Sequence, residues 1–298
     1  MAPETFAAPA AHLVAFCNSN FTQTKRRFRR QVNKFGMLTS HSVLDEEDLP
    51  IDFRRRHQSL LRQGVRGYGY WIWKPRIVLL ALENLAEGEI LIYVDVGFHV
   101  RRRGRARFSS WVTELASSTE DFLVFSSIYP EGYPLGDGRK YTPRLEFQWT
   151  KGDTIDKMGL RGSRHLLSPQ IGAGIFLVRN SESSRKLIRD WANFMETDPS
   201  LIDDSPSVAP DTPGFIEHRH DQSIFSLLIK VAGSAVVRSS AEYWWPTRAG
   251  TGADWWALRE SPFLAKRDLK QVSITSAIRE VRKGVGGMWD QLRSHFTL

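Results

Sequence analysis

The chain has 298 residues, of which 41% are hydrophobic and 25% are charged, and it carries a formal net charge of +8. This composition is typical of a folded globular protein and excludes an intrinsically disordered one. A single cysteine, Cys17, excludes an intrachain disulfide and a multi-cysteine zinc site. No apolar run approaches the roughly 20 residues of a membrane-spanning helix. Because no basic region precedes the small apolar residues at the N-terminus, we expect no secretory signal and a cytoplasmic protein.

The first third of the chain alternates apolar runs with amphipathic segments. In order, the pattern predicts a strand at 13–17, a helix at 22–35, a strand at 41–44, a helix at 53–61, a loop from residue 67, a helix at 75–85 and a strand at 90–94. The last strand has no polar break, as expected of a strand buried on both faces. This alternation predicts the opening of a doubly wound α/β domain.

The rest of the chain continues in the same manner. It predicts a helix at 108–115, a strand at 122–125, a long loop at 126–144, a helix start within 146–157, a strand at 175–178, a helix at 183–195, a loop at 198–213, a helix at 224–231 and a strand at 235–237. We therefore predict one domain over 1–242. The tryptophan-rich, basic extension at 243–298 is expected to pack on the domain or to lie at an anionic membrane surface.

Asp95 follows the apolar run 90–94 and precedes Val96 and Gly97. Open α/β sheets bind their ligands at the carboxyl ends of strands, where this acid falls. Mg²⁺ and Mn²⁺ prefer carboxylate oxygens and often use one or two of them together with substrate phosphates. We predict that Asp95 binds a metal or a diphosphate, against the alternative that it caps a turn. A second ligand would have to come from elsewhere, because position 97 is glycine.

The segment 217–223, EHRHDQS, is the predicted source of that second ligand. His218 and His220 alternate, so they share one face of an extended segment. His220 and Asp221 fall at a helix start, where the helix dipole favours an anion such as a diphosphate. We predict a Mn²⁺ or Mg²⁺ site made by Asp95, His218 and His220. In the alternative interpretation, Asp221 only caps the helix.

The predicted catalytic candidates are Asp221, His220 and Asp153. An acid–base role fits the two residues at the helix start, whereas Asp153 is a weaker candidate from the segment EFQWTKGDTIDK. A zinc hydrolase is not indicated, because the HExxH pattern is absent. The dinucleotide, P-loop and nucleophile-elbow patterns are absent as well, which argues against dinucleotide-binding proteins, NTPases and α/β-hydrolases.

The aromatic segment GYGYWIWKP contains Tyr70, Trp71, Trp73 and Lys74 in its second half. Indole rings beside an ammonium group suit a sugar or a phosphate, so we predict that these four residues bind the ligand. The alternative is an aromatic core cluster in front of a helix. The basic surplus favours anionic partners. We predict no nucleic-acid partner, because no recognised nucleic-acid module surrounds the arginines of 101–107.

Four segments together resemble bacterial nucleotide-sugar glycosyltransferases of the GT-A type. They read GYGYWIWKP, LIYVDVG, SPQIGAGIFLVRN and HRHDQSIFSLL, and the resemblance extends over most of 14–237. It implies a GT-A-like fold, in which a mixed, mostly parallel sheet is flanked by helices. It also implies that Asp95 holds the metal or the donor diphosphate. Such enzymes commonly carry a second acid where this chain has Gly97, which makes metal dependence an open question.

The same resemblance assigns the remaining site residues. It implies that Gln170, Gly172 and Gly174 line the pocket of the donor sugar, and that Asp221 and Gln222 contact the donor sugar or the acceptor. The implied activity is transfer of a sugar from a nucleotide sugar, a UDP-sugar by expectation, to a glycan or lipid-linked glycan of lipopolysaccharide or capsule type. Peripheral membrane contact is part of that expectation.

Two alternative functions stay open at this point. One is a metal-dependent phosphoester hydrolase or nucleotidyltransferase that uses Asp95 and the two histidines. The other is a glycan-binding protein without catalytic activity. The products distinguish the enzymes, because a transferase releases a nucleoside diphosphate whereas the rivals release a nucleoside monophosphate or inorganic phosphate.

Overall fold

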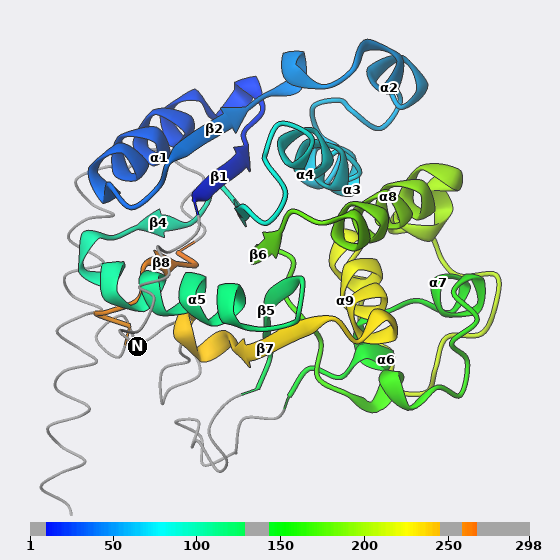
Figure 1. The fold of residues 1–298 in the computed structure, drawn as a ribbon. Coiled ribbons are helices and arrows are strands. Elements are labelled where there is room, and N and C mark those ends of the chain that lie inside the picture. Colours follow the sequence, from blue (N-terminus) through cyan, green and yellow to red (C-terminus); the bar gives the residue numbers. More distant parts are fainter. Residues whose placement is uncertain (1–9, 129–142, 245–257, 267–298) are drawn as a thin grey trace, which may run out of the picture.

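A computed structural model describes residues 10–128, 143–244 and 258–266 (Figure 1). Its centre is a six-stranded sheet in the order β2-β1-β3-β6-β5-β7. The strands are β1 (Ala11–Phe16), β2 (Ser40–Leu44), β3 (Ile90–Val94), β5 (Phe122–Ser126), β6 (Ile175–Arg179) and β7 (Ala235–Ser239). Strand β6 runs antiparallel to both its neighbours, and the other three pairings are parallel. The predicted mixed, mostly parallel sheet is therefore confirmed.

Helices cover both faces of this sheet (Figure 1). They are α1 (Thr22–Phe35), α2 (Ile51–Arg56), α3 (Gly67–Tyr70), α4 (Lys74–Leu82), α5 (Arg105–Ser117), α6 (Glu146–Trp149), α7 (Gly152–Lys157), α8 (Glu182–Thr197) and α9 (Asp221–Ala232). Alternate residues of each strand point to opposite faces. In β3, Leu91 and Tyr93 join the core under α4, α8 and α9, whereas Ile92 joins the core under α1 and α5.

Local signals in the sequence account for most helix ends. Helix α1 occupies the predicted range and stops at Gly36, whose φ of 62° is the left-handed conformation that glycine adopts readily. Helix α4 has Pro75 in its first turn. The helix predicted at 53–61 is shorter than expected and begins earlier in the chain, at Ile51, where it forms α2. The segment 146–157 forms two short helices, α6 and α7, instead of one.

A small second sheet joins β4 (His99–Val100) to β8 (Phe263–Leu264). The described part of the predicted extension, 258–266, therefore packs on the domain, and Phe263 lies in the core under α1 and α5. The tryptophans at 245, 255 and 256 and the basic stretch at 273–296 lie outside the described residues. Within the described ranges, no helix has both the length and the apolar character needed to cross a membrane.

Candidate functional site

A cavity of about 660 Å³ opens beside the carboxyl ends of β1 and β3. Phe16 ends β1 and residues 17–18 follow it along one wall, and residues 95–98 follow β3 along another. The chain leaves β1 toward β2 on one side and later returns as β3 on the other side, so the strand order reverses at this point. Open α/β sheets bind their ligands at such a reversal. The topology therefore places the cavity where a ligand is expected.

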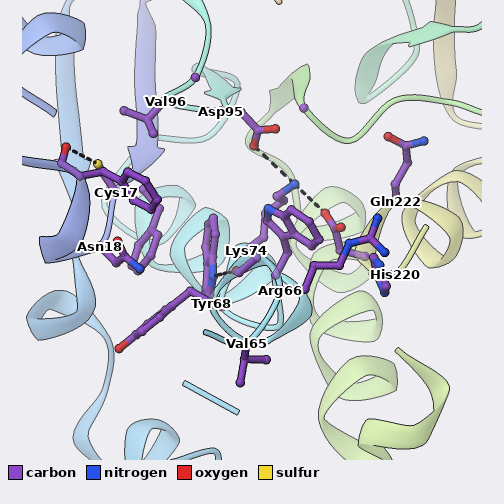
Figure 2. A pocket seen from close by; sticks show the side chains of 18 of the residues that line it. Cys17, Asn18, Val65, Arg66, Tyr68, Lys74, Asp95, Val96, His220 and Gln222 are labelled. Atoms are coloured by element: carbon purple, nitrogen blue, oxygen red, sulfur yellow. Dashed lines mark hydrogen bonds and ion pairs between the residues drawn. The ribbon is translucent and has the colours of Figure 1, made fainter. Parts of the chain in front are cut away.

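Lys74, Asp95 and Asp221 form a charge cluster in this cavity (Figure 2). The Nζ atom of Lys74 lies 2.6 Å from Oδ2 of Asp221 and 3.5 Å from Oδ1 of Asp95. It also donates a hydrogen bond to the carbonyl oxygen of Ala173 at 3.2 Å. Lys74 and Asp221 are buried, whereas the Asp95 side chain is 36% exposed. Asp95 is thus the acid of the cluster that a ligand can reach most directly.

The cluster changes the proton affinities of its members. Burial raises the pKa of Asp221 to about 6, although Lys74 opposes this shift. Burial alone would lower the pKa of Lys74, but its two carboxylate neighbours outweigh burial and raise it. Tyr93 donates a hydrogen bond to Oδ1 of Asp95 at 2.6 Å, and burial keeps the pKa of this phenol well above its usual value. The ammonium and the phenol therefore both stay protonated near neutral pH.

Lys74 is held in place by an unusual turn. All five residues from Gly67 to Trp71 have positive φ angles, between 52° and 93°. This left-handed conformation costs each non-glycine residue about 1–2 kcal/mol. The indole of Trp71 packs over Gly67, and Nε1 of Trp73 donates a hydrogen bond to the Gly67 carbonyl at 3.0 Å. Strain of this kind persists where the surroundings enforce it, commonly at functional sites.

The predicted aromatic residues divide into two groups. Trp71 and Trp73 line the cavity, but Trp73 is buried and stacks on Phe16 with ring centroids 4.0 Å apart. Tyr70 is not among the described residues that line the cavity, and it packs against His220 at 5.2 Å. Tyr70 and most of the Trp73 side chain therefore belong to the aromatic core cluster of the alternative interpretation. The ring of Trp71 lines the cavity, where a ligand could contact it.

The three predicted metal ligands are not brought together. His218 accepts from the backbone N–H of Lys151 through Nδ1, and its Nε2 bonds the carbonyl of Leu201, so both ring nitrogens are occupied. His220 lines the cavity, but its Nδ1 bonds the carbonyl of Ile202 at 2.6 Å. Among the described residues, no three His, Cys, Asp or Glu side chains form a group that could hold a metal ion.

Asp95 and His220 are thus the two predicted metal ligands that line the cavity, and Asp95 supplies the only carboxylate of the three. One of its oxygens already accepts from Tyr93 and lies near the Lys74 ammonium, and Gly97 adds no second carboxylate. This donor set does not fit a metal centre made by the protein. A cation held by Asp95 together with ligand phosphates stays a prediction.

Asp153 is not near the cavity. Its two carboxylate oxygens accept hydrogen bonds from the backbone N–H groups of Val208 and Ala209, at 2.9 and 2.7 Å. It therefore shapes the 198–213 loop, and its predicted catalytic role does not fit this position. Asp221 and His220, the other two candidates, do line the cavity. Burial lowers the pKa of His220, so its ring is uncharged near neutral pH.

The glutamine and glycine residues assigned to the donor sugar occupy different depths. Gln222 and Gly174 line the cavity, and a Cβ atom at Gly174 would lie 3.0 Å from Oδ2 of Asp95. Gln170 is buried behind Gln222 and accepts a hydrogen bond from its Nε2 at 2.6 Å. Gly172 faces the hydroxyl of Tyr243 instead. Gln170 and Gly172 are thus not among the described residues that line the cavity.

Several cavity residues were missed by the sequence analysis. Asn18 is buried at the end of β1, and its Oδ1 atom has no hydrogen-bond partner among the described residues. The rule applied to Asp95, a polar residue just past a buried strand, would have found it. Arg66 pairs with Asp204 and Glu217, which are distant in sequence, so no local pattern marks it. The other missed wall residues include Arg62, Tyr68 and Arg219.

No protein-family model matches this sequence, and neither does any curated protein sequence. Solved structures with similar folds include a glycosyltransferase involved in glycosylation of the major capsid of PBCV-1, which is 12% identical with a TM-score of 0.47, over 87% of this chain and 98% of that chain. The galactosyltransferase LgtC is 14% identical with a TM-score of 0.41, over 78% and 74% of the two chains. Core-mannan synthase A from Aspergillus fumigatus is 8% identical with a TM-score of 0.38, over 78% and 73%. These values describe a likeness in fold and assign no ligand to this chain.

Proposed function

We propose that this chain is a glycosyltransferase that moves a sugar from a UDP-sugar to a hydroxyl group of a glycan acceptor. The observation that carries the proposal is the cavity at the reversal of strand order, with the Lys74–Asp95–Asp221 cluster on its wall. Its volume lies within the roughly 300–1,000 Å³ of small-molecule sites. The resemblance of the four sequence segments extends the proposal to an acceptor of lipopolysaccharide or capsule type, made at the cytoplasmic face of a membrane.

The two ends of the cavity suit the two ends of a nucleotide sugar. At one end, Tyr68 provides an aromatic ring and Asn18 an unpartnered amide oxygen, which suit the flat face and the hydrogen-bonding edge of a base. At the other end, Asp95 and Gln222 provide acceptors for sugar hydroxyl groups.

The charge of the cavity suits a leaving diphosphate. Among the described residues, the cavity is lined by two carboxylates, Asp95 and Asp221, and by four cationic side chains, namely Arg62, Arg66, Lys74 and Arg219. A departing nucleoside diphosphate develops negative charge, which fixed cations stabilise. Arg66 and Arg219 also contact Glu217, and Lys74 contacts Asp221, so a bound diphosphate would share these cations with the carboxylates. We expect nucleotide binding without a metal ion on this basis.

The reaction needs one proton acceptor. The acceptor hydroxyl oxygen forms a bond to the sugar C1 atom while the bond from C1 to the diphosphate oxygen breaks, and the hydroxyl proton passes to a base. We assign this proton to Asp221, because a pKa raised to about 6 matches a base that works near neutral pH. Asp95 then faces the positive charge that develops on the sugar.

The first test is nucleotide binding, measured as thermal stabilisation. A ligand that binds only the folded state raises the melting temperature. We expect UDP to stabilise the chain more than GDP, CMP or dTDP, both with Mn²⁺ and with a chelator. A shift that disappears in the chelator would retain the transferase but require a metal at Asp95. Absence of any shift would contradict the proposed donor.

The second test is turnover in matched variants. Asp221→Asn should lower UDP release from a UDP-sugar by about 100-fold, because a positioned base contributes at least that factor. The control is Asp153→Asn, whose carboxylate contacts the 198–213 loop and which should keep normal turnover. Release of UMP or inorganic phosphate would favour the hydrolase. Nucleotide binding with no product from any UDP-sugar would favour a binding protein.

A further inference from the structure

A line of buried polar side chains runs from α9 to the cavity. It begins at Lys230, whose Nζ lies 2.6 Å from Oε1 of Glu146, and continues through Gln170 to Gln222. Glu146 is completely buried and Gln170 is 2% exposed, so neither can contact a ligand. Gln222 is half-buried and lines the cavity. The line therefore joins a closed interior to the proposed active site.

The direction of the hydrogen bonds in this line is set at its Lys230 end, and two longer contacts agree with it: Nε2 of Gln170 donates to Oγ of Ser223, and the N–H of Ala173 donates to Oε1 of Gln222, both at 3.4 Å. An ammonium group only donates, and Ser226 also donates its hydroxyl proton to Oε1 of Glu146. The other carboxylate oxygen, Oε2, accepts from Nε2 of Gln170 at 3.1 Å. Both oxygens of Glu146 thus face donors, which requires the ionised, acceptor-only form.

The orientation of the two amides follows from that carboxylate. Since Gln170 must turn Nε2 toward Glu146, its Oε1 faces Gln222 and accepts from Nε2 of Gln222 at 2.6 Å. The Oε1 atom of Gln222 accepts a hydrogen bond from the backbone N–H of Ala173 at 3.4 Å. Figure 2 shows this amide oxygen on the side of Asp95. The amide of Gln222 therefore presents an acceptor to the cavity.

We propose that Glu146 and Gln170 are positioning residues, which orient the Gln222 amide so that its oxygen accepts a hydrogen bond from a hydroxyl group of the donor sugar. This inference rests on the proposed function for the identity of the ligand. The orientation of the amide itself does not, because it follows from contacts within the chain. Glu146 and Gln170 act only through Gln222, which is the residue that contacts the sugar.

The variant Glu146→Gln should exchange the donor and acceptor roles along this line of hydrogen bonds. The new amide must keep its oxygen toward Lys230 and Ser226, which leaves its N–H₂ group facing Gln170. We expect Gln170 and then Gln222 to turn over in response, giving up the two 3.4 Å contacts with Ser223 and Ala173, so that Gln222 presents N–H instead of oxygen. The double variant Glu146→Gln/Gln170→Glu moves the carboxylate by one position. Its carboxylate at position 170 accepts from both neighbours and returns the oxygen of Gln222 to the cavity.

Steady-state kinetics of UDP release test this reversal. UDP-glucose, UDP-galactose and UDP-N-acetylglucosamine are the probes, and the one that the wild-type chain uses best is followed. Glu146→Gln should raise its KM by roughly ten-fold, the effect of one lost hydrogen bond in a buried site, with little change in kcat. The double variant should restore KM. A merely structural role would predict that the double variant stays impaired, and an unchanged KM in Glu146→Gln would overturn the inference.

A ligand-free measurement separates this inference from the proposed function. In wild-type protein labelled with ¹⁵N-glutamine, the side-chain N–H₂ of Gln222 should exchange slowly with water, because it is bound to Gln170. Exchange should become fast in Glu146→Gln and slow again in the double variant. If no probe yields UDP, the proposed function fails while this exchange pattern still decides the inference.

A third variant covers the case in which Glu146→Gln does not fold. Gln170→Met removes the partner of Gln222 without adding a charge, and it should also raise KM by roughly ten-fold and speed the exchange of the Gln222 amide. Normal KM and slow exchange in folded Gln170→Met would show that Gln222 is oriented by other contacts. That result would overturn the proposal.

Discussion

Two buried lysine–carboxylate pairs lie at opposite ends of α9 and have the same spacing. Lys230 and Glu146 approach to 2.6 Å, and so do Lys74 and Asp221. Around Glu146, the carboxylate oxygens also accept from Ser226 and Gln170. Around Asp221, Oδ2 has the ion pair but no hydrogen bond of good geometry among the described residues. The first pair is closed and fully partnered, and the second opens on the cavity.

Under the proposed function, this difference assigns the first pair to structure and the second to chemistry. A buried ion pair offsets its desolvation only when further hydrogen bonds satisfy its remaining atoms, as they do for Glu146. Burial raises the pKa of both carboxyls, but Ser226 and Gln170 oppose the rise at Glu146, whereas the neighbouring Asp95 adds to it at Asp221, where the pKa reaches about 6. Incompletely satisfied groups with shifted pKa values are concentrated in active sites, where a substrate completes them. The two pairs should respond oppositely to substitution.

The largest expected effect on stability comes from removing one lysine of each pair. Lys230→Met leaves the fully buried Glu146 carboxylate without its counter-ion and should lower the free energy of unfolding by about 3–5 kcal/mol. Lys74→Met should cost less, about 1–3 kcal/mol, because Asp221 takes up a proton readily and the cavity admits water. Urea unfolding at pH 7 measures both values.

The two variants should rank in the reverse order when UDP binding, rather than stability, is measured. Lys74→Met should abolish stabilisation by UDP, whereas Lys230→Met, if folded, should retain most of it. Equal losses of stability, or normal UDP binding in Lys74→Met, would contradict the division into a closed and an open pair.

The fold was largely predictable because its strands are short apolar runs with clear ends. The helix at 22–35 and the strand at 90–94 were predicted with their observed bounds. The antiparallel direction of β6 was not predictable, because an apolar run such as IFLVR reads alike in both directions. The pairing of β8 with β4 joins residues more than 150 positions apart, and no local pattern encodes it.

The site was predicted in part, and the misses share one cause. Asp95 and Asp221 were predicted from their places at element ends, Lys74 from the tryptophans beside it and Gln222 from the family resemblance, and all four line the cavity. His218, Asp153 and Gln170 follow the same local patterns, yet tertiary contacts use up their polar atoms. Sequence position shows which residues lie near a sheet edge. Whether their side chains are already bonded within the protein depends on segments distant in the chain.

The second prediction concerns pH and tests the open pair directly. Burial raises the pKa of Asp221 to about 6 in the folded chain, against 3.8 for a solvent-exposed aspartate. Between these values the folded state binds more protons than the unfolded state, so this group makes the protein less stable as pH rises through the window. The difference corresponds to about 3 kcal/mol. The variant Asp221→Asn should not show this decrease in stability with rising pH.

The measurement is the stability of wild type minus that of Asp221→Asn, taken at six pH values from 2 to 7, a range that includes the unfolded value of 3.8 and the folded value of about 6. The difference should fall by about 3 kcal/mol as pH rises. Asp156→Asn is the control, because the surface contact with Arg161 lowers the pKa of Asp156 and the sign should be opposite. A flat curve for Asp221 would indicate that Lys74 fully compensates the carboxylate, which would make the open pair equivalent to the closed one.

The smallest expected effect concerns the turn that holds Lys74, which has no counterpart at Lys230 inside α9. Gly67 and Gly88 both have positive φ angles, 59° and 85°. Alanine at Gly88 meets no atom within 4 Å, so Gly88→Ala should cost only the backbone strain, about 1 kcal/mol. At Gly67 the added Cβ would lie 2.4 Å from the Trp71 ring, and Gly67→Ala should cost about 2 kcal/mol more.

Thermal unfolding compares the two variants, and UDP stabilisation should weaken only in Gly67→Ala, because displacing Trp71 disturbs the backbone that leads into Lys74. Equal stability and equal UDP binding in the two variants would mean that the left-handed turn is not what places the ammonium between Asp95 and Asp221.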